Sequence, residues 1–253
     1  SVCEDCGAVQ IHYNSCRNRC CPMCQAVPKE MWMDARREDV LDAPYFHLVF
    51  TVPDILNPII YNNQKLLYDT LYHAASATIS ELTADPKHLG ADVGYICILH
   101  TWGSEMNFHP HIHTILLGGG LTPKNEWKDN GTEFFLPIGA ISKVFRGKYM
   151  DELKNLWNTN QLKFHGTAEK YRNHYEFKKL IDSCYDAEWI PYCKKTFNGA
   201  QSVIDYLGKY THRIAISNHR IICVDDKNVT FSVKDYRNKG QWKELTLSGV
   251  EFI

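Results

Sequence analysis

Three histidines near the middle of the chain have the spacing of metal ligands. His111 and His113 stand two positions apart in the segment His109-Pro110-His111-Ile112-His113, and the alternation of a β-strand sends them to the same face. His100 closes the preceding apolar segment, so an antiparallel hairpin could bring its side chain beside the pair. Three neutral imidazoles with open positions are typical of a catalytic divalent-metal site. A solvated or hydrogen-bonded polar face is the alternative interpretation.

The residues around this motif disfavour hydrolysis by metal-bound water. Zinc hydrolases with a His-x-His motif normally carry a nearby carboxylate that activates water, and residues 114–120 contain none. We therefore expect the nucleophile to be a side chain from another segment. His109 is the substitute ligand if one of the three fails, and we expect it to face away if the strand begins at or before it.

Two tyrosines supply the candidate nucleophile. Tyr206 and Tyr210 are four positions apart, which places both phenols on one face of a helix, with Lys209 and Arg213 close enough to contact a phosphate. A phenol has a pKa near 10 and attacks poorly unless a cation lowers the cost of its ionisation or polarises the target. Tyrosine pairs at this spacing are more often core residues, and Lys209 and Arg213 could be solvated charges.

Taken with the histidines, the tyrosine pair predicts attack on a phosphodiester, where a metal stabilises charge on the phosphoryl oxygens. We favour Tyr206 for the first attack, because Tyr210 lies nearer the end of the predicted helix, where fraying loosens the geometry.

The first 24 residues hold six of the ten cysteines, a crowding that indicates a metal site in a reducing compartment. Two Cys-x2-Cys pairs with fourteen residues between them have the spacing of a four-cysteine zinc ribbon. Four thiolates leave no open position, so we expect structural Zn²⁺ bound by Cys3, Cys6, Cys21 and Cys24. Cys16 is a possible alternate ligand, and the role of Cys20 stays open.

The elements that must position these residues can be read from apolar periodicity. Buried strands are expected over 45–52, 94–100 and 111–117, with the last two paired and Gly118-Gly119-Gly120 ending the third. Helices are expected over 29–39, 64–82, 141–162 and 200–211. Residues 163–198 receive only a weak assignment, and short strands are expected over 220–224, 229–233 and 241–247.

The composition of the 253 residues is that of an ordinary globular protein, with 44% hydrophobic and 23% charged residues and no apolar run long enough to span a membrane. We expect a cytoplasmic protein. The net charge is −1, but residues 194–253 hold ten Lys and Arg against six Asp and Glu. This part, with a net charge of +4, is where a polyanion would bind. The start at Ser1-Val2-Cys3 suggests that the natural protein extends upstream.

The combination resembles the rolling-circle insertion-sequence transposases of the insertion sequence ninety-one type, within the His-hydrophobic-His (HUH) endonuclease superfamily. The resemblance covers nearly the whole chain and is carried by residues 13–25, 99–103, 109–113, 118–120, 145–148 and 206–213. Members commonly carry His where this chain has Cys20. Whether the residue at position 20 binds zinc therefore stays open. Members of the family continue beyond the position of Ile253. We therefore expect that this sequence is a part of a longer protein, trimmed at both ends.

The resemblance implies an α+β fold: a zinc-binding segment over residues 1–28, then an HUH nuclease domain over 29–253 with an antiparallel sheet flanked by helices. In that superfamily a tyrosine attacks single-stranded DNA, leaving a 5′-phosphotyrosine and a free 3′-hydroxyl. The resemblance thus implies a transposase that acts on single-stranded DNA at transposon ends. It implies Mg²⁺ or Mn²⁺ bound by His100, His111 and His113. Related relaxases likewise have a third metal-binding His upstream of the pair, which supports His100.

Two alternatives stay open at this point. The same chemistry would serve a plasmid replication initiator or a relaxase, and a chain with a decayed nuclease site could be a zinc protein that binds DNA. The sequence does not give the recognised DNA sequence, the physiological divalent metal or the oligomeric state.

Overall fold

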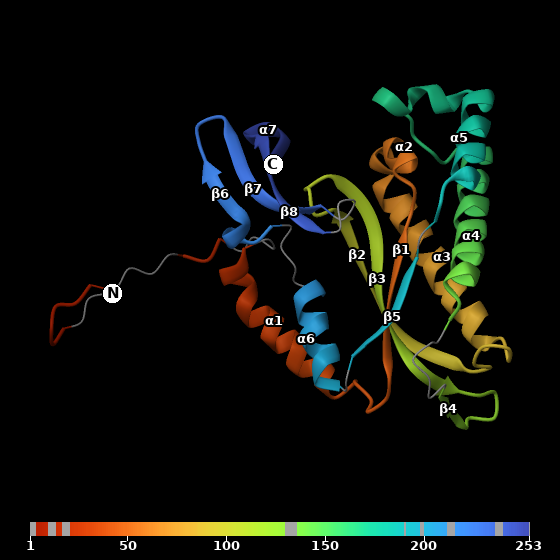
Figure 1. Cartoon of the computed structure of the whole chain (residues 1–253), viewed down its shortest axis with the longest axis horizontal. Helices are drawn as coiled ribbons and strands as arrows, with labels where there is room; N and C mark the ends of the chain where they lie inside the picture. Colours follow the sequence, from red (N-terminus) through yellow and green to blue (C-terminus); the bar gives the residue numbers. More distant parts are fainter. Residues whose placement is uncertain are drawn as a thin grey trace.

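The computed structural model describes residues 4–9, 14–16, 21–129, 136–189, 191–197, 200–211, 216–235 and 240–252. Its centre is an antiparallel sheet in the order β2-β3-β1-β5, with β4 paired to the end of β3 (Figure 1). The strands are β1 (Tyr45–Thr51), β2 (Asp92–Trp102), β3 (Phe108–Leu121), β4 (Trp127–Asp129) and β5 (Tyr192–Phe197).

One face of this sheet carries the main core. Phe46, Leu48 and Phe50 alternate along β1 and are almost fully buried, together with Ile112 and Leu116 of β3. They are covered by α2 (Asn57–Asn62), α3 (Gln64–Ala84), α4 (Ile138–Asn158) and α5 (His174–Asp186) (Figure 1). Such alternation makes one side of each strand hydrophobic, and helices whose apolar stripes face it exclude water from it.

The opposite face is covered by two helices from distant parts of the chain, α1 (Pro22–Arg37) and α6 (Ala200–Thr211) (Figure 1). Tyr45, Ile115 and Leu117 of the sheet form a smaller core with Val203 of α6, and Trp32 of α1 packs against it. The histidines are on this same face, because His111 and His113 alternate with the buried Ile112 of the main core.

A second sheet of three antiparallel strands follows, β6 (Ile221–Val224), β7 (Asn228–Asp235) and β8 (Gln241–Ser248), and the described chain ends in α7 (Gly249–Phe252). Arg220, in the short 3-10 turn η3 (Asn218–Arg220), joins the two sheets: its guanidinium donates to the carbonyl oxygens of Ser232 and of Ser104, at 2.8 and 2.7 Å. Lys243 of β8 forms an ion pair with Glu105 in the turn between β2 and β3. These contacts hold the second sheet against the end of the first.

The α+β architecture with an antiparallel sheet flanked by helices is confirmed. The predicted strands and helices are present, although the helix expected over 141–162 ends at Asn158. Helices α2 and α7 and strand β4 were not predicted. Three other differences concern α1, residues 163–198 and β3. Helix α1 begins at Pro22, because proline is favoured at the first position of a helix, and it continues through Pro28. The weakly assigned region 163–198 contains the 3-10 helix η2 (Gly166–Arg172), α5 and β5. The division of the chain at residue 28 stays a prediction.

The third difference is that residues 118–120 lie inside β3 and do not end it. A Cβ at Gly120 would stand 2.0 Å from the carbonyl oxygen of Asp92, and one at Gly119 would meet Trp127 and the backbone of Lys128. The glycines let the neighbouring backbones of β2 and β4 approach β3 closely. In the described part of the chain, none of the helices has the length and apolar character needed to span a bilayer.

Candidate functional site

The pairing of β2 with β3 gathers the three predicted histidines. His100 is the direct cross-strand partner of His111, and His113 follows two residues later on the same face of β3. His100 and His113 are buried, and one ring nitrogen from each of the three imidazoles lies within 4.8 Å of the others. The sheet register, fixed by the apolar residues on the opposite face, therefore brings together side chains that a hairpin separates in sequence.

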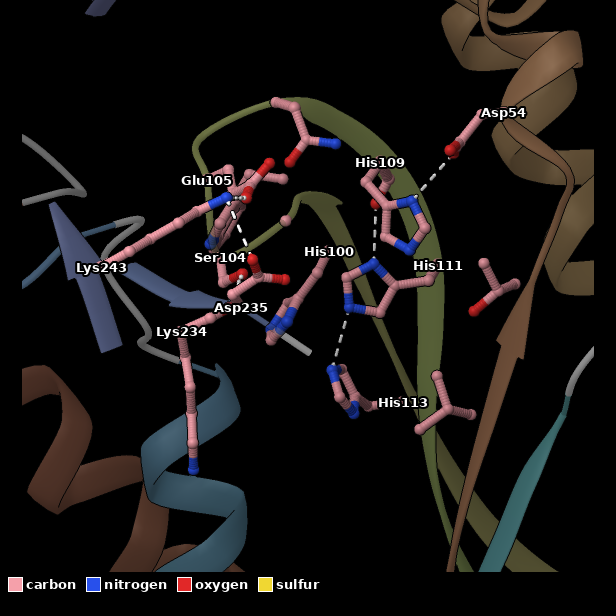
Figure 2. A pocket seen from close by; sticks show the side chains of 15 residues that line it. Asp54, His100, Ser104, Glu105, His109, His111, His113, Lys234, Asp235 and Lys243 are labelled. Atoms are coloured by element: carbon pink, nitrogen blue, oxygen red, sulfur yellow. Dashed lines mark hydrogen bonds and ion pairs between the residues drawn. The ribbon is translucent and has the colours of Figure 1, made fainter. Parts of the chain in front are cut away.

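Hydrogen bonds orient these rings. His111 Nδ1 lies 2.7 Å from the carbonyl oxygen of His109; because a carbonyl only accepts, Nδ1 carries the proton and Nε2 keeps its lone pair. The Nε2 atoms of His111 and His113 are 3.1 Å apart and point at the same place (Figure 2). Two convergent imidazole nitrogens beside a third are a donor set that fits a divalent cation. The His109 carbonyl would then be the outer hydrogen-bond partner of the candidate ligand His111.

Tyr206 of α6 reaches this cluster. Its hydroxyl lies 2.5 Å from Nε2 of His47 and 3.4 Å from Nδ1 of His113. The position of α6 follows from its packing: Val203 is buried against the sheet, and Gly208 lets Met33 of α1 approach the helix backbone. The structure thus places one of the two predicted tyrosines beside the histidines.

His47 of β1 is a residue of the site that the sequence analysis missed. Burial lowers the pKa of its imidazole to about 4, so the ring is neutral and Nε2 can accept a hydrogen bond. Its ring stacks on His113, with centroids 5.1 Å apart. The signal that could have found it is a titratable side chain inside an otherwise apolar buried strand, which needs a polar partner.

A cavity of about 590 Å³ opens beside the histidine cluster. The three histidines and Thr51 line one side, the β2–β3 turn contributes Ser104, Glu105 and Asn107, and the second sheet contributes Lys234, Asp235 and Lys243. Figure 2 shows Lys243 reaching from β8 to Glu105, across the cavity from His111. The second sheet therefore supplies the wall opposite the candidate metal ligands, with positive and negative charges at its rim.

The expectation that His109 faces away is wrong. Strand β3 begins at Phe108, and alternation puts His109 on the same side as His111. His109 lines the cavity, and its Nδ1 is 3.2 Å from a carboxylate oxygen of Asp54 (Figure 2). Among the described residues, the group close enough to share one ion consists of the three predicted histidines and excludes His109.

The remaining predicted residues of this site are only partly described. Tyr210 and Lys209 lie on α6, in its last turn, but their side chains are outside the described part of the structure. Arg213 also lies outside the described residues. Their roles therefore stay predictions.

Three cysteines form a second candidate metal site at the beginning of α1. The sulfurs of Cys16, Cys21 and Cys24 lie within 4.8 Å of one another. Cys21 is the N-cap residue of the helix and Cys24 lies in its first turn, where the helix dipole favours thiolates. The Ser15 hydroxyl donates to Cys24 Sγ at 3.1 Å.

The two other predicted zinc ligands are Cys3 and Cys6. Within the described part of the chain, Cys6 is exposed and is not one of the three clustered cysteines, while Cys3 and Cys20 lie outside the described residues. The arrangement favours the alternative in which Cys16 is a ligand.

Comparison with known families supports both parts of the chain. Residues 94–253 match the family described as "Putative transposase", and residues 1–52 match the family described as "Transposase zinc-binding domain". The chain belongs to this transposase family. The resemblance stated from the motifs is thereby confirmed at the level of the family, and the predicted zinc-binding segment has a matching domain.

Two relatives have similar names. The chain is 38% identical over 253 residues to "Putative transposase y4qJ" of Sinorhizobium fredii (strain NBRC 101917 / NGR234), covering 100% of this chain and 64% of the relative. It is 29% identical over 255 residues to "Transposase for insertion sequence element IS801" of Pseudomonas savastanoi pv. phaseolicola, covering 99% of this chain and 59% of the relative. The chain therefore spans less than two thirds of the length of these relatives.

More distant similarity is found to solved structures of the conjugative relaxase TrwC in complex with oriT DNA. The metal-bound structure has a TM-score of 0.34 and 12% identity, covering 68% of this chain and 72% of the relaxase chain. The metal-free structure also has a TM-score of 0.34, with 13% identity, covering 72% and 78%.

Proposed function

We propose that the chain cuts and rejoins single-stranded DNA at transposon ends during rolling-circle transposition. The observation that carries the proposal is the phenol of Tyr206, which lies 3.4 Å from Nδ1 of His113, a member of the three-histidine cluster. A tyrosine nucleophile beside a candidate cation site is an arrangement suited to phosphodiester transfer. Membership of the transposase family supports the same reaction class.

In the proposed reaction, the phenolic oxygen of Tyr206 loses its proton and attacks phosphorus in line with the leaving 3′ oxygen. A bond forms between tyrosine and the 5′ phosphate, the bond from phosphorus to the 3′ oxygen breaks, and that oxygen takes up a proton to become a 3′-hydroxyl. The energy of the phosphodiester is kept in the phosphotyrosine. A free 3′-hydroxyl can therefore reverse the step and join strands without an external energy source.

His100, His111 and His113 are the residues that would hold Mg²⁺ or Mn²⁺. When bound, the ion would stabilise negative charge on the phosphoryl oxygens. The histidines would fix its place on the sheet, since the register of β2 and β3 determines where their nitrogens converge. His111 is held by the carbonyl oxygen of His109, so that its Nε2 faces the shared position.

Tyr206 is the favoured first nucleophile and Tyr210 the candidate for a second transfer. The contact of the Tyr206 hydroxyl with the site supports the first assignment. Tyr210 lies one helical turn further along α6, so the two phenols can approach a phosphate in succession but not together. Lys209 and Arg213 are proposed to contact DNA phosphates beside them.

The zinc-binding segment is proposed to hold structural Zn²⁺ through Cys16, Cys21 and Cys24 with a fourth ligand from Cys3 or Cys6. Their grouped sulfurs and the matching zinc-binding domain support this. Because Cys21 caps α1 and Cys24 lies in its first turn, and α1 packs on α6, zinc would also stabilise the helix that supports α6 and Tyr206. The two named relatives are bacterial, so the proposed place of action is the cytoplasm, on nucleoid DNA.

A nicking assay tests the proposal. Single-stranded oligonucleotides that tile the element's ends are incubated with the chain and Mn²⁺, each in two forms, labelled at the 3′ or the 5′ end. Because the 5′ phosphate stays on tyrosine, the 3′ label should migrate with protein on a denaturing gel, and the 5′ label should appear as a shorter free strand.

The variants decide which residues react. Removing both hydroxyls, in Tyr206→Phe, Tyr210→Phe, should abolish the adduct and leave DNA binding intact, because affinity rests on phosphate contacts. Tyr192→Phe serves as the matched control and should behave as the unmodified chain. An adduct that survives in the double variant would exclude this pair. The absence of any adduct from the unmodified chain would favour a zinc protein that binds DNA without cutting it.

A further inference from the structure

His47 occupies the point where the proposed nucleophile and a proposed metal ligand meet. It lies on β1, opposite Ile115 of β3, and its neighbour at position 49 is opposite His113. Positions 47 and 113 are therefore diagonal neighbours on one face of the sheet, within reach of each other's side chains. The helix face that carries Tyr206 covers this position, so His47 is buried between the sheet and α6.

One nitrogen of His47 makes both contacts. Its Nε2 lies 2.9 Å from Nδ1 of His113 and 2.5 Å from the hydroxyl of Tyr206. The third side of this triangle, from the Tyr206 hydroxyl to His113 Nδ1, is 3.4 Å. In the tautomers with the proton on Nδ1 of both rings, Nε2 of His47 is the acceptor that faces both the N–H of His113 and the O–H of Tyr206.

The contact at His113 Nδ1 is important because the other nitrogen of the ring, Nε2, is the proposed metal-binding atom. His113 Nε2 points toward His111 Nε2, the place where the ligands converge. A histidine that binds a metal through Nε2 needs an acceptor for its Nδ1–H, and that acceptor fixes the ring's tautomer and orientation. His109 provides it for His111 through its backbone carbonyl. For His113 the acceptor within 2.9 Å is a side chain, which is also the partner of the tyrosine.

We propose that His47 is a positioning residue that orients the metal ligand His113 and the nucleophile Tyr206 through the same nitrogen. This inference rests on the proposed function, because it assigns Tyr206 as the nucleophile. It goes further by linking the two halves of the site, because Nδ1 of the proposed ligand His113 and the hydroxyl of the proposed nucleophile Tyr206 share one partner atom, Nε2 of His47. In this proposal His47 acts through His113 and Tyr206.

Two substitutions of His47 by residues of similar size distinguish the loss of its hydrogen-bond acceptor from the loss of the ring's volume. Gln and Met have similar length, but only Gln places a strong acceptor near the position of Nε2. His47→Met should weaken Mn²⁺ binding, measured by calorimetry, and slow single-turnover adduct formation, each by about 10- to 100-fold, which is the usual effect of losing such an outer partner. His47→Gln should recover most of both losses. Circular dichroism establishes that each variant is folded.

Tyr192→Phe is the matched control. The Tyr192 ring also contacts His47, with centroids 5.5 Å apart, but it approaches the ring edge to face and supplies no partner to Nε2 in the described contacts. This variant should keep the Mn²⁺ affinity and the adduct rate of the unmodified chain within about twofold. A loss as large as that of His47→Met would mean that packing around His47, and not its acceptor, controls the site.

A spectroscopic measurement keeps the inference testable if the Met variant does not fold. In long-range ¹H–¹⁵N spectra of the Mg²⁺-loaded chain, His113 should be the tautomer protonated on Nδ1, and the opposite tautomer would overturn the inference. Unchanged Mn²⁺ affinity and adduct rate in His47→Met, or equal losses in His47→Met and His47→Gln, would also overturn it. If the unmodified chain forms no adduct but His47→Met still binds Mn²⁺ more weakly, the proposed function fails and the link to His113 stands.

Discussion

The contact between α1 and α6 gives a sharp prediction, because it sets the distance of Tyr206 from the histidines. Gly208 of α6 faces Met33 of α1, and a Cβ at Gly208 would stand 2.3 Å from Met33 Sδ and 3.1 Å from Lys29 Cε. Ordinary contacts between such atoms are about 3.5–4.0 Å. Gly208→Ala must therefore push the two helices apart by roughly 1 Å, or force the buried Met33 side chain into another rotamer.

The free-energy cost of the contact with Met33 can be measured by comparison with a second helical glycine. Gly147 lies within α4, and a Cβ there would meet nothing within 4 Å. Alanine gains about 0.5–1 kcal/mol over glycine in a helix, so Gly147→Ala should be stabilising by that amount. Gly208→Ala has the same gain but adds an overpacking cost of about 1–3 kcal/mol. The free energies of unfolding of the two variants should therefore differ by about 1–3 kcal/mol.

Urea unfolding followed by circular dichroism measures this difference, and single-turnover adduct formation measures its effect on the site. A displacement of Tyr206 on the order of 1 Å should slow the reaction by about 100-fold, while Gly147→Ala leaves the rate unchanged. Adding Met33→Ala to Gly208→Ala should restore the rate, because it removes the side chain that the new Cβ meets. If Gly208→Ala is as stabilising as Gly147→Ala and cuts DNA at the normal rate, the packing argument is refuted.

Three further predictions follow from the two metal sites and the sheet. His113→Ala should lower the affinity for Mn²⁺ by at least about 100-fold in calorimetry, whereas His109→Ala should keep it within about tenfold; the reverse order would reassign the ligand. Metal analysis of protein purified without chelator should find about one zinc per chain, lost in Cys24→Ser, and zinc retained by that variant would exclude Cys24. Gly120→Ala should be destabilising by about 3 kcal/mol or more in urea unfolding, the upper end of the overpacking range, because its Cβ meets backbone; a value near zero would contradict the close approach of β2.

The local sequence pattern was sufficient to predict the part of the candidate site that lies on one β-hairpin. The apolar runs before His100 and around His111 predicted two paired strands, and alternation along them put His111 and His113 on one face. Helix periodicity likewise predicted α6 and placed Tyr206 on it. In each case the information lies in residues that are close in sequence and have one dominant period.

The missed parts depend on contacts between distant segments. Strand β5 contains two adjacent lysines and follows a proline, and its place beside β1 is set by pairing with residues about 150 positions away. His47 was read as one residue of a buried strand, because its partners Tyr206 and His113 are 159 and 66 positions away. The tail was predicted as strands, but no periodicity could show that Lys243 would close the cavity opposite His111.

The central claim is that a tyrosine of α6 becomes covalently joined to DNA. The most direct measurement is mass spectrometry of the adduct formed with single-stranded end DNA and Mn²⁺, after digestion of the DNA by nuclease and of the protein by protease. The account predicts a 5′-phosphonucleotide on the peptide that contains Tyr206 and Tyr210, with Tyr206 as the first residue modified. A modification found on Tyr192 or Tyr236, or DNA that is cut without any residue being modified, would contradict it.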